Sequence, residues 1–130
     1  MMIQNAPVYD KTVLVVDDDP AFCELIQEIL RGRRYQVLTA HNGLEAVEWT
    51  KHGHIDLILM DVRMPLFSGY WYCSVFKKKK NTCNIPIVMV SGMLDEDGVK
   101  KARLAGACAC VKKPFSCQEL LDAVEQNVLR

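Results

Sequence analysis

The 130-residue sequence has no hydrophobic run long enough to cross a membrane and no excess of either charge. A membrane-spanning helix needs about 20 apolar residues, and lysine plus arginine equal aspartate plus glutamate at 16 each. The bulk charge gives no reason to expect a nucleic acid or a membrane surface as partner. Residues 1–10 lack a basic start followed by an apolar segment, so we interpret them as a flexible leader and not as a secretory signal.

The sequence also lacks any pair of cysteines spaced as C-x-x-C, and its three histidines lie away from its six cysteines. This spacing argues against a zinc site. Several of the cysteines fall within apolar patterns, where a free thiol behaves as a small hydrophobic side chain. We therefore expect reduced thiols and a cytoplasmic location. The cysteines are Cys23, Cys73, Cys83, Cys108, Cys110 and Cys117.

Five apolar segments alternate with five segments of helical periodicity. We expect strands at 13–16, 35–40, 57–60, 85–90 and 107–111. We expect helices that begin at Pro20, span about 44–50, 70–80 and 95–105, and follow Ser116, with Gly98 breaking the fourth helix near its start. Lysines 77–80 end a helix, where cations favour the negative end of the helix dipole, so we prefer a solvated helix end to a nucleic-acid-binding run. The alternation predicts one α/β domain with a parallel sheet and helices on both faces.

Polar residues stand where four of the expected strands end. Asp17 and Asp18 follow the first strand, Asp61 the third, Ser91 the fourth and Lys113 the fifth. In an open α/β sheet these ends lie at one edge, so Asp61 should be an exposed side chain near the others. Three neighbouring carboxylates repel each other unless a cation lies among them, and Mg²⁺ prefers such oxygen ligands. A lysine and a hydroxyl beside a carboxylate and a metal are the groups needed to handle a phosphoryl group.

The chain resembles the receiver domain of bacterial two-component response regulators over about residues 11–129. The motifs that carry the resemblance are 15–18 (VVDD), 56–65 with Gly69, 87–91 and 113–115 (KPF), in the order found in that family. The resemblance implies a receiver domain at 11–130. It also implies a flavodoxin-like, doubly wound fold with a five-stranded parallel sheet in the order 2-1-3-4-5.

The resemblance further implies a role for each strand-end residue. Asp61 is expected to accept a phosphoryl group from a histidine kinase or a phosphotransfer protein. Ser91 and Lys113 are expected to contact the phosphoryl oxygens, and the face of the fourth helix, fifth strand and fifth helix to carry the output. The expected Mg²⁺ ligands are Asp17, Asp18, Asp61 and the backbone carbonyl of Arg63.

The sequence departs from the family pattern in two places. Many receivers carry tyrosine or phenylalanine three residues before the motif lysine, whereas this chain has Cys110. The usual aromatic switch is therefore absent. Arg63 and Met93, at the positions that tune hydrolysis of the acyl phosphate, provide no acid or amide to orient water. We expect a slowly decaying phosphorylated form.

Other functions remain open on the sequence alone. A pseudo-receiver would use the same fold as a constitutive protein-interaction module. A phosphatase of the aspartyl-phosphate type would carry its nucleophile on the first strand, whereas the nucleophile expected here, Asp61, ends the third. A flavin-binding module is disfavoured because acids at the strand ends repel a phosphate group. The preferred interpretation is a phosphoacceptor switch, and not an enzyme with a free substrate.

Overall fold

The computed structural model describes residues 10–92 and 94–128, so the expected leader lies outside the described residues except for Asp10. The strands are β1 (Lys11–Val16), β2 (Tyr35–Ala40), β3 (Leu57–Asp61), β4 (Ile87–Ser91) and β5 (Ala109–Lys112). The helices are α1 (Pro20–Leu30), α2 (Gly43–His52), α3 (Gly69–Lys78), α4 (Glu96–Ala105) and α5 (Cys117–Asn127). Every expected element is present, and most boundaries differ from the prediction by one or two residues.

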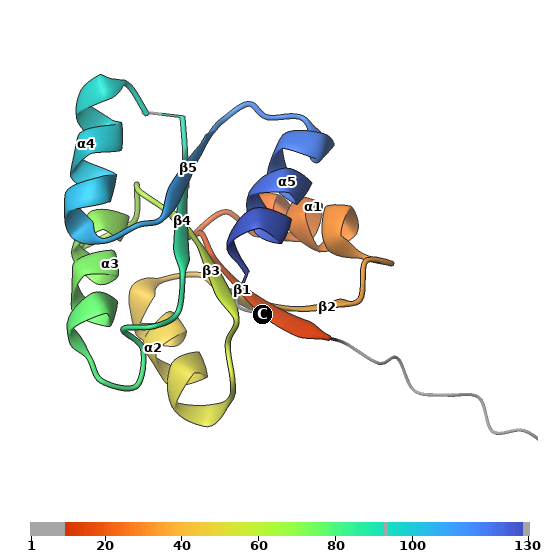
Figure 1. The fold of residues 1–130 in the computed structure, drawn as a ribbon, viewed down its shortest axis with the longest axis horizontal. Coiled ribbons are helices and arrows are strands. Elements are labelled where there is room, and N and C mark those ends of the chain that lie inside the picture. Colours follow the sequence, from red (N-terminus) through yellow and green to blue (C-terminus); the bar gives the residue numbers. More distant parts are fainter. Residues whose placement is uncertain (1–9, 93, 129–130) are drawn as a thin grey trace, which may run out of the picture.

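The five strands form one parallel sheet in the order β2-β1-β3-β4-β5, as predicted. Helices α1 and α5 cover one face, and α2, α3 and α4 cover the other (Figure 1). The fold is therefore the expected flavodoxin-like, doubly wound architecture. None of the described helices is long and apolar enough to cross a lipid bilayer.

The apolar side chains of β1 and β3 divide between two cores. Leu14 and Met60 pack with α2, α3 and α4 around Phe76. Val15 and Leu59 pack with α1 and α5 on the opposite face. Because successive side chains of a strand point to opposite faces and both faces are covered, β1 is apolar throughout 13–16 and β3 throughout 57–60.

Short polar side chains begin the helices as the sequence predicts. The Asp19 side chain accepts the backbone N–H of Ala21, and Ser116 forms a capping box with Glu119. At α2, the Asn42 side chain accepts the backbone N–H of Glu45, and the Glu45 carboxylate accepts the backbone N–H of His41.

The expected break at Gly98 is wrong. Helix α4 runs through Gly98 without interruption. The backbone N–H of Gly98 donates to Asp95 Oδ1 at 2.8 Å, so this glycine belongs to the capped first turn of α4. The cap of Asp95 offsets the low helix propensity of the glycine.

Candidate functional site

Three carboxylates meet at the carboxyl ends of β1 and β3. Asp17 and Asp18 directly follow β1, and Asp61 is the last residue of β3. One oxygen from each carboxylate lies within 4.8 Å of the others. The expectation that Asp61 is exposed is wrong, because its relative exposure is only 8%. The strand includes Asp61 itself, so the side chain is still sheltered by neighbouring elements.

Asp17 is held on both carboxylate oxygens. Its Oδ1 accepts the backbone N–H of Asp19 at 2.9 Å, and its Oδ2 accepts Lys113 Nζ at 3.1 Å. Lys113 Nζ also lies 3.9 Å from Asp61 Oδ1. Asp17 is 1% exposed, whereas Asp18 is exposed to solvent. The structure thus brings Lys113 to the carboxylates, with Asp18 on the open side of the cluster.

The pKa of Asp61 is raised from 3.8 to about 6, first by burial and second by the neighbouring charge of Asp17. Lys113 and the backbone N–H of Arg63 act in the opposite direction, but less strongly. A cluster of like charges at this position is relieved by a cation. Three hard carboxylate oxygens on one open edge suit Mg²⁺, which keeps several waters when it binds to proteins. The donor set therefore fits a magnesium site.

Ser91 and Arg63 border the cluster in different ways. Ser91 ends β4 and is fully buried, and its backbone carbonyl accepts the backbone N–H of Lys113 at 2.9 Å. Arg63 lies in the β3–α3 loop with an exposed side chain, and its backbone N–H donates to the Asp61 carboxylate. Met93, the other residue expected to influence hydrolysis, lies outside the described residues.

Cys110 stands at the position where the resemblance leads us to expect the switch aromatic, and it packs against the same core as Tyr70. Cys110 is half-buried on β5, opposite Met89 of β4, and burial raises the pKa of its thiol. The Tyr70 hydroxyl donates to the backbone carbonyl of Gly98 at 3.2 Å and so joins α3 to α4. The sequence does not single out Tyr70. No local pattern distinguishes a core tyrosine from one that bonds a neighbouring helix.

Phe22 of α1 is a second residue at the site that the sequence does not single out. Lys113 Nζ lies over the Phe22 ring, 3.9 Å from the ring centroid. The signal was absent from the sequence because residues 22 and 113 are far apart in the chain. Only the packing of α1 beside the β5–α5 loop brings them together.

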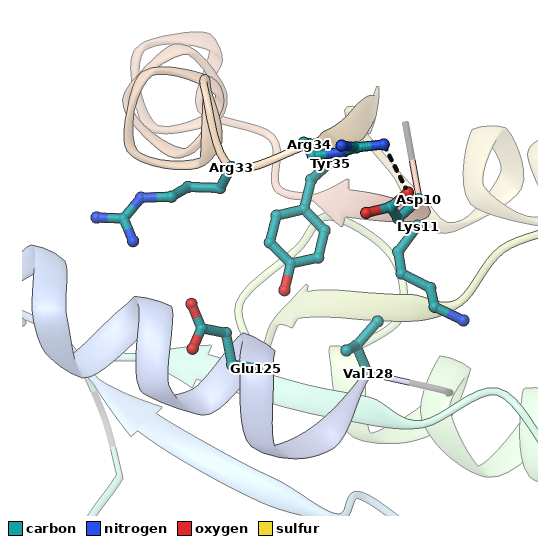
Figure 2. Close-up of a pocket in the computed structure, with 7 residues that line it drawn as sticks. All are labelled: Asp10, Lys11, Arg33, Arg34, Tyr35, Glu125 and Val128. Carbon is teal, nitrogen blue, oxygen red and sulfur yellow. Dashed lines mark hydrogen bonds and ion pairs between the residues drawn. The ribbon is translucent and has the colours of Figure 1, made fainter. Parts of the chain in front are cut away.

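A separate pocket of about 330 Å³ lies at the other edge of the sheet. Lys11, which begins β1, lines it, whereas the carboxylates follow the end of β1. Figure 2 shows the Arg34 guanidinium directed toward the Asp10 carboxylate. The two groups form an ion pair with 3.1 Å between the nearest nitrogen and oxygen atoms. The lining residues are Asp10, Lys11, Arg33, Arg34, Tyr35, Glu125 and Val128. This pocket is therefore not part of the carboxylate site.

Comparison with known proteins identifies the family of this chain. Residues 13–125 match the response regulator receiver domain, and the chain belongs to that family. It is thus a phosphoacceptor domain of two-component signalling and not an enzyme with a free substrate.

Individual relatives agree along nearly the whole chain. The polar-differentiation response regulator DivK of Brucella ovis is 26% identical over 115 residues, which are 88% of this chain and 94% of DivK. The chemotaxis protein CheY4 of Vibrio cholerae superposes with a TM-score of 0.85 at 26% identity, covering 90% of this chain and 98% of CheY4.

A third relative bears on the metal. The receiver domain of the sensor histidine kinase PA1611 from Pseudomonas aeruginosa has a TM-score of 0.81 at 26% identity, covering 90% of this chain and 96% of that domain. That structure has a magnesium ion coordinated in the active site cleft. The acidic cluster of this chain is consistent with a site of the same kind.

Proposed function

We propose that residues 11–130 form a receiver that takes a phosphoryl group on Asp61 from a histidine kinase or a phosphotransfer protein. Receiver domains in general have histidine kinases as partners. The observation that carries the proposal is the meeting of Asp17, Asp18 and Asp61 within 4.8 Å of one another. Lys113 Nζ, 3.1 Å from Asp17 and 3.9 Å from Asp61, supplies the positive charge beside them.

The transfer is a displacement at phosphorus. A carboxylate oxygen of Asp61 attacks the phosphorus atom of the donor, and the bond from phosphorus to the donor breaks. The leaving group departs with the bonding electron pair and takes up a proton, while Asp61 becomes an acyl phosphate. With a pKa of about 6, Asp61 is ionised at neutral pH and can attack as a carboxylate. Under mildly acidic conditions Asp61 becomes protonated, and its reactivity as a nucleophile falls.

The expected Mg²⁺ ligands are the side chains of Asp17, Asp18 and Asp61 and the backbone carbonyl of Arg63. When bound, Mg²⁺ would neutralise charge on the carboxylates and on the phosphoryl oxygens. Asp18 offers the most accessible oxygens, whereas both oxygens of Asp17 already accept hydrogen bonds. We therefore assign direct ligation of Mg²⁺ to Asp18 and Asp61. Asp17 would lie next to these ligands and hold Lys113 beside the site.

The acyl phosphate adds about one negative charge at the edge of the sheet. Ser91 at the end of β4 would donate to one phosphoryl oxygen, and Lys113 would pair with another. Two charge-assisted hydrogen bonds at about 1.5–3 kcal/mol each approach the ~5.5 kcal/mol that a nearly complete two-state switch requires. If Ser91 moved toward the phosphoryl group, the β4–α4 loop would move with it. This movement would change the face formed by α4, β5 and α5.

The output face and the cellular location are further parts of the proposal. Cys110 stands where many receivers carry the switch aromatic, so the α4–β5–α5 face must report phosphorylation by other contacts. That face is where we place the downstream protein or output domain; we assign no nucleic-acid or membrane contact to this domain. All six cysteines are free thiols, which favours a reducing cytoplasmic location.

The proposal is tested by the uptake of a phosphoryl group from a small donor. The purified chain is incubated with acetyl phosphate, with Mg²⁺ in one sample and with EDTA in the other, and its intact mass is measured. We expect one phosphoryl group in the presence of Mg²⁺ and little in EDTA. A chain that gains none with Mg²⁺, while remaining folded, would instead be a pseudo-receiver that acts as a constitutive interaction module.

A further inference from the structure

The Lys113 ammonium is enclosed by two kinds of contact. On one side it meets carboxylates, with Asp17 Oδ2 at 3.1 Å and Asp61 Oδ1 at 3.9 Å. The Phe22 ring is its third neighbour, at 3.9 Å from Nζ to the ring centroid. The Lys113 side chain is 28% exposed, so it has room to leave the cluster for solvent. The ring is therefore part of what holds the ammonium in place.

Phe22 is itself fixed between the two loops that build the site. It lies in the first turn of α1, directly after the acidic loop 17–19 and the helix cap of Asp19. Its ring packs edge-on against Phe115, with centroids 6.0 Å apart at 84°. Phe115 follows Lys113 by two residues. Phe22 thus contacts the β5–α5 loop at Lys113 and at Phe115.

We infer that Phe22 is a positioning residue for phosphoryl transfer, which holds the Lys113 ammonium over the carboxylates through a cation–π contact. This inference rests on the proposed function of Asp61. A bare apolar residue at position 22 would pack against Phe115 but would not attract the ammonium. Lys113 would then sample solvent-facing rotamers, and fewer molecules would present a cation to the incoming phosphoryl group.

The first measurement reports the contact without any phosphorylation. Aromatic rings shift protons above their face upfield, so the Hε protons of Lys113 should appear upfield of those of the other lysines in NMR spectra. This displacement should disappear in Phe22→Leu and persist in Phe22→Tyr, which retains an aromatic face. Unchanged Lys113 Hε shifts in Phe22→Leu would overturn the inference.

The second measurement is the initial rate of phosphoryl uptake from acetyl phosphate with Mg²⁺. We expect Phe22→Leu to slow it about 2- to 10-fold, the range of a partly desolvated cation–π contact, and Phe22→Tyr to restore it. Ile29→Ala, on the same helix and packed against the same core, controls for loss of stability. This control should leave the rate unchanged.

A double-mutant cycle separates positioning from general structural damage. In the Lys113→Met background, Phe22→Leu should have no further effect on the rate, because the ammonium it positions is gone. An equal slowing in both backgrounds would contradict the inference. If the wild-type protein takes up no phosphoryl group, the proposed function fails, and the Hε shift still decides whether Phe22 holds Lys113.

Discussion

Gly69 packs directly against the backbone carbonyl of Asp61. A Cβ atom at position 69 would overlap the Asp61 carbonyl oxygen and press on the Met89 side chain. The backbone N–H of Gly69 also donates to the Val62 carbonyl at 2.8 Å, which closes the β3–α3 loop. The start of α3 is thus set against the residue proposed to take the phosphoryl group.

This contact predicts that Gly69→Ala displaces Asp61 or the loop after it. We expect a loss of about 1–3 kcal/mol in the free energy of unfolding, typical of overpacking a tight interior. The rate of phosphoryl uptake should fall as well. Gly53→Ala is the matched control, because nothing lies within 4 Å of a Cβ at position 53. Wild-type stability and uptake in Gly69→Ala would show that the loop yields without cost.

Asp18→Ala should weaken Mg²⁺ binding by at least about 10-fold, because it removes an accessible ligand. The metal-free variant should be no less stable than the wild type, since a like charge leaves the cluster. Magnesium titrations followed by amide NMR shifts would measure the affinity.

Asp19→Ala is the control for the magnesium titration. The Asp19 side chain caps α1 by accepting the Ala21 N–H at 3.0 Å and is not part of the carboxylate cluster. This variant should lose about 1 kcal/mol of stability and largely retain its Mg²⁺ affinity. Equal Mg²⁺ affinities in Asp18→Ala and the wild type would remove Asp18 from the site.

The pKa of Asp61 predicts how stability depends on pH in metal-free protein. Burial, together with the charge of Asp17, raises this pKa from 3.8 to about 6, so the folded state binds a proton more tightly than the unfolded state. The resulting stabilisation is fully present below about pH 4 and is lost as the pH rises through about 6.

Asp61→Asn removes that pH dependence. Urea unfolding in EDTA at pH 5 and pH 7.5 would compare the variant with the wild type. The gain in stability of the variant should be larger at the higher pH, where the wild-type carboxylate is ionised and buried. A difference that is the same at both pH values would show that Asp61 titrates normally in the folded chain.

The lifetime of the acyl phosphate is predicted to be long. Neither Arg63 nor Met93 can act as a base toward an attacking water, and a positioned base can accelerate such a step ~100-fold or more. The double variant Arg63→Asn, Met93→Glu should therefore lose its phosphoryl group faster than the wild type once the donor is removed. Leu66→Asn adds an amide to the same exposed loop and serves as control. Equal decay rates in all three proteins would show that positions 63 and 93 do not set the lifetime of the acyl phosphate.

The elements of the fold follow from patterns that are local in sequence. Apolar runs such as 57–60 predict buried strands, and Asp19 and Ser116 predict helix starts, because a cap bonds backbone groups only two or three residues away. Gly98 misled the prediction because intrinsic propensity ignores the cap that Asp95 provides.

The site was predictable only in part. Its strand-end acids and Lys113 could be placed together because parallel strands end at one edge of a sheet. The burial of Asp61 could not, since it depends on how far β3 extends and on the loops around it. The Phe22–Lys113 and Tyr70–Gly98 contacts join elements distant in sequence, and their residue types are also common in ordinary cores.

The central claim is that Asp61 takes the phosphoryl group, and a comparison with Asp56, which lies at the other end of the same apolar segment, tests it most directly. Asp56 precedes β3 and is buried at the opposite end, where its Oδ2 accepts the Thr12 N–H at 2.8 Å. The experiment compares the wild type with Asp61→Asn and Asp56→Asn, after circular dichroism has shown that each is folded. Each protein is incubated with acetyl phosphate and Mg²⁺, and its intact mass is measured by mass spectrometry. We predict one phosphoryl group on the wild type and on Asp56→Asn, and none on Asp61→Asn. Uptake by Asp61→Asn to the wild-type extent would contradict the account.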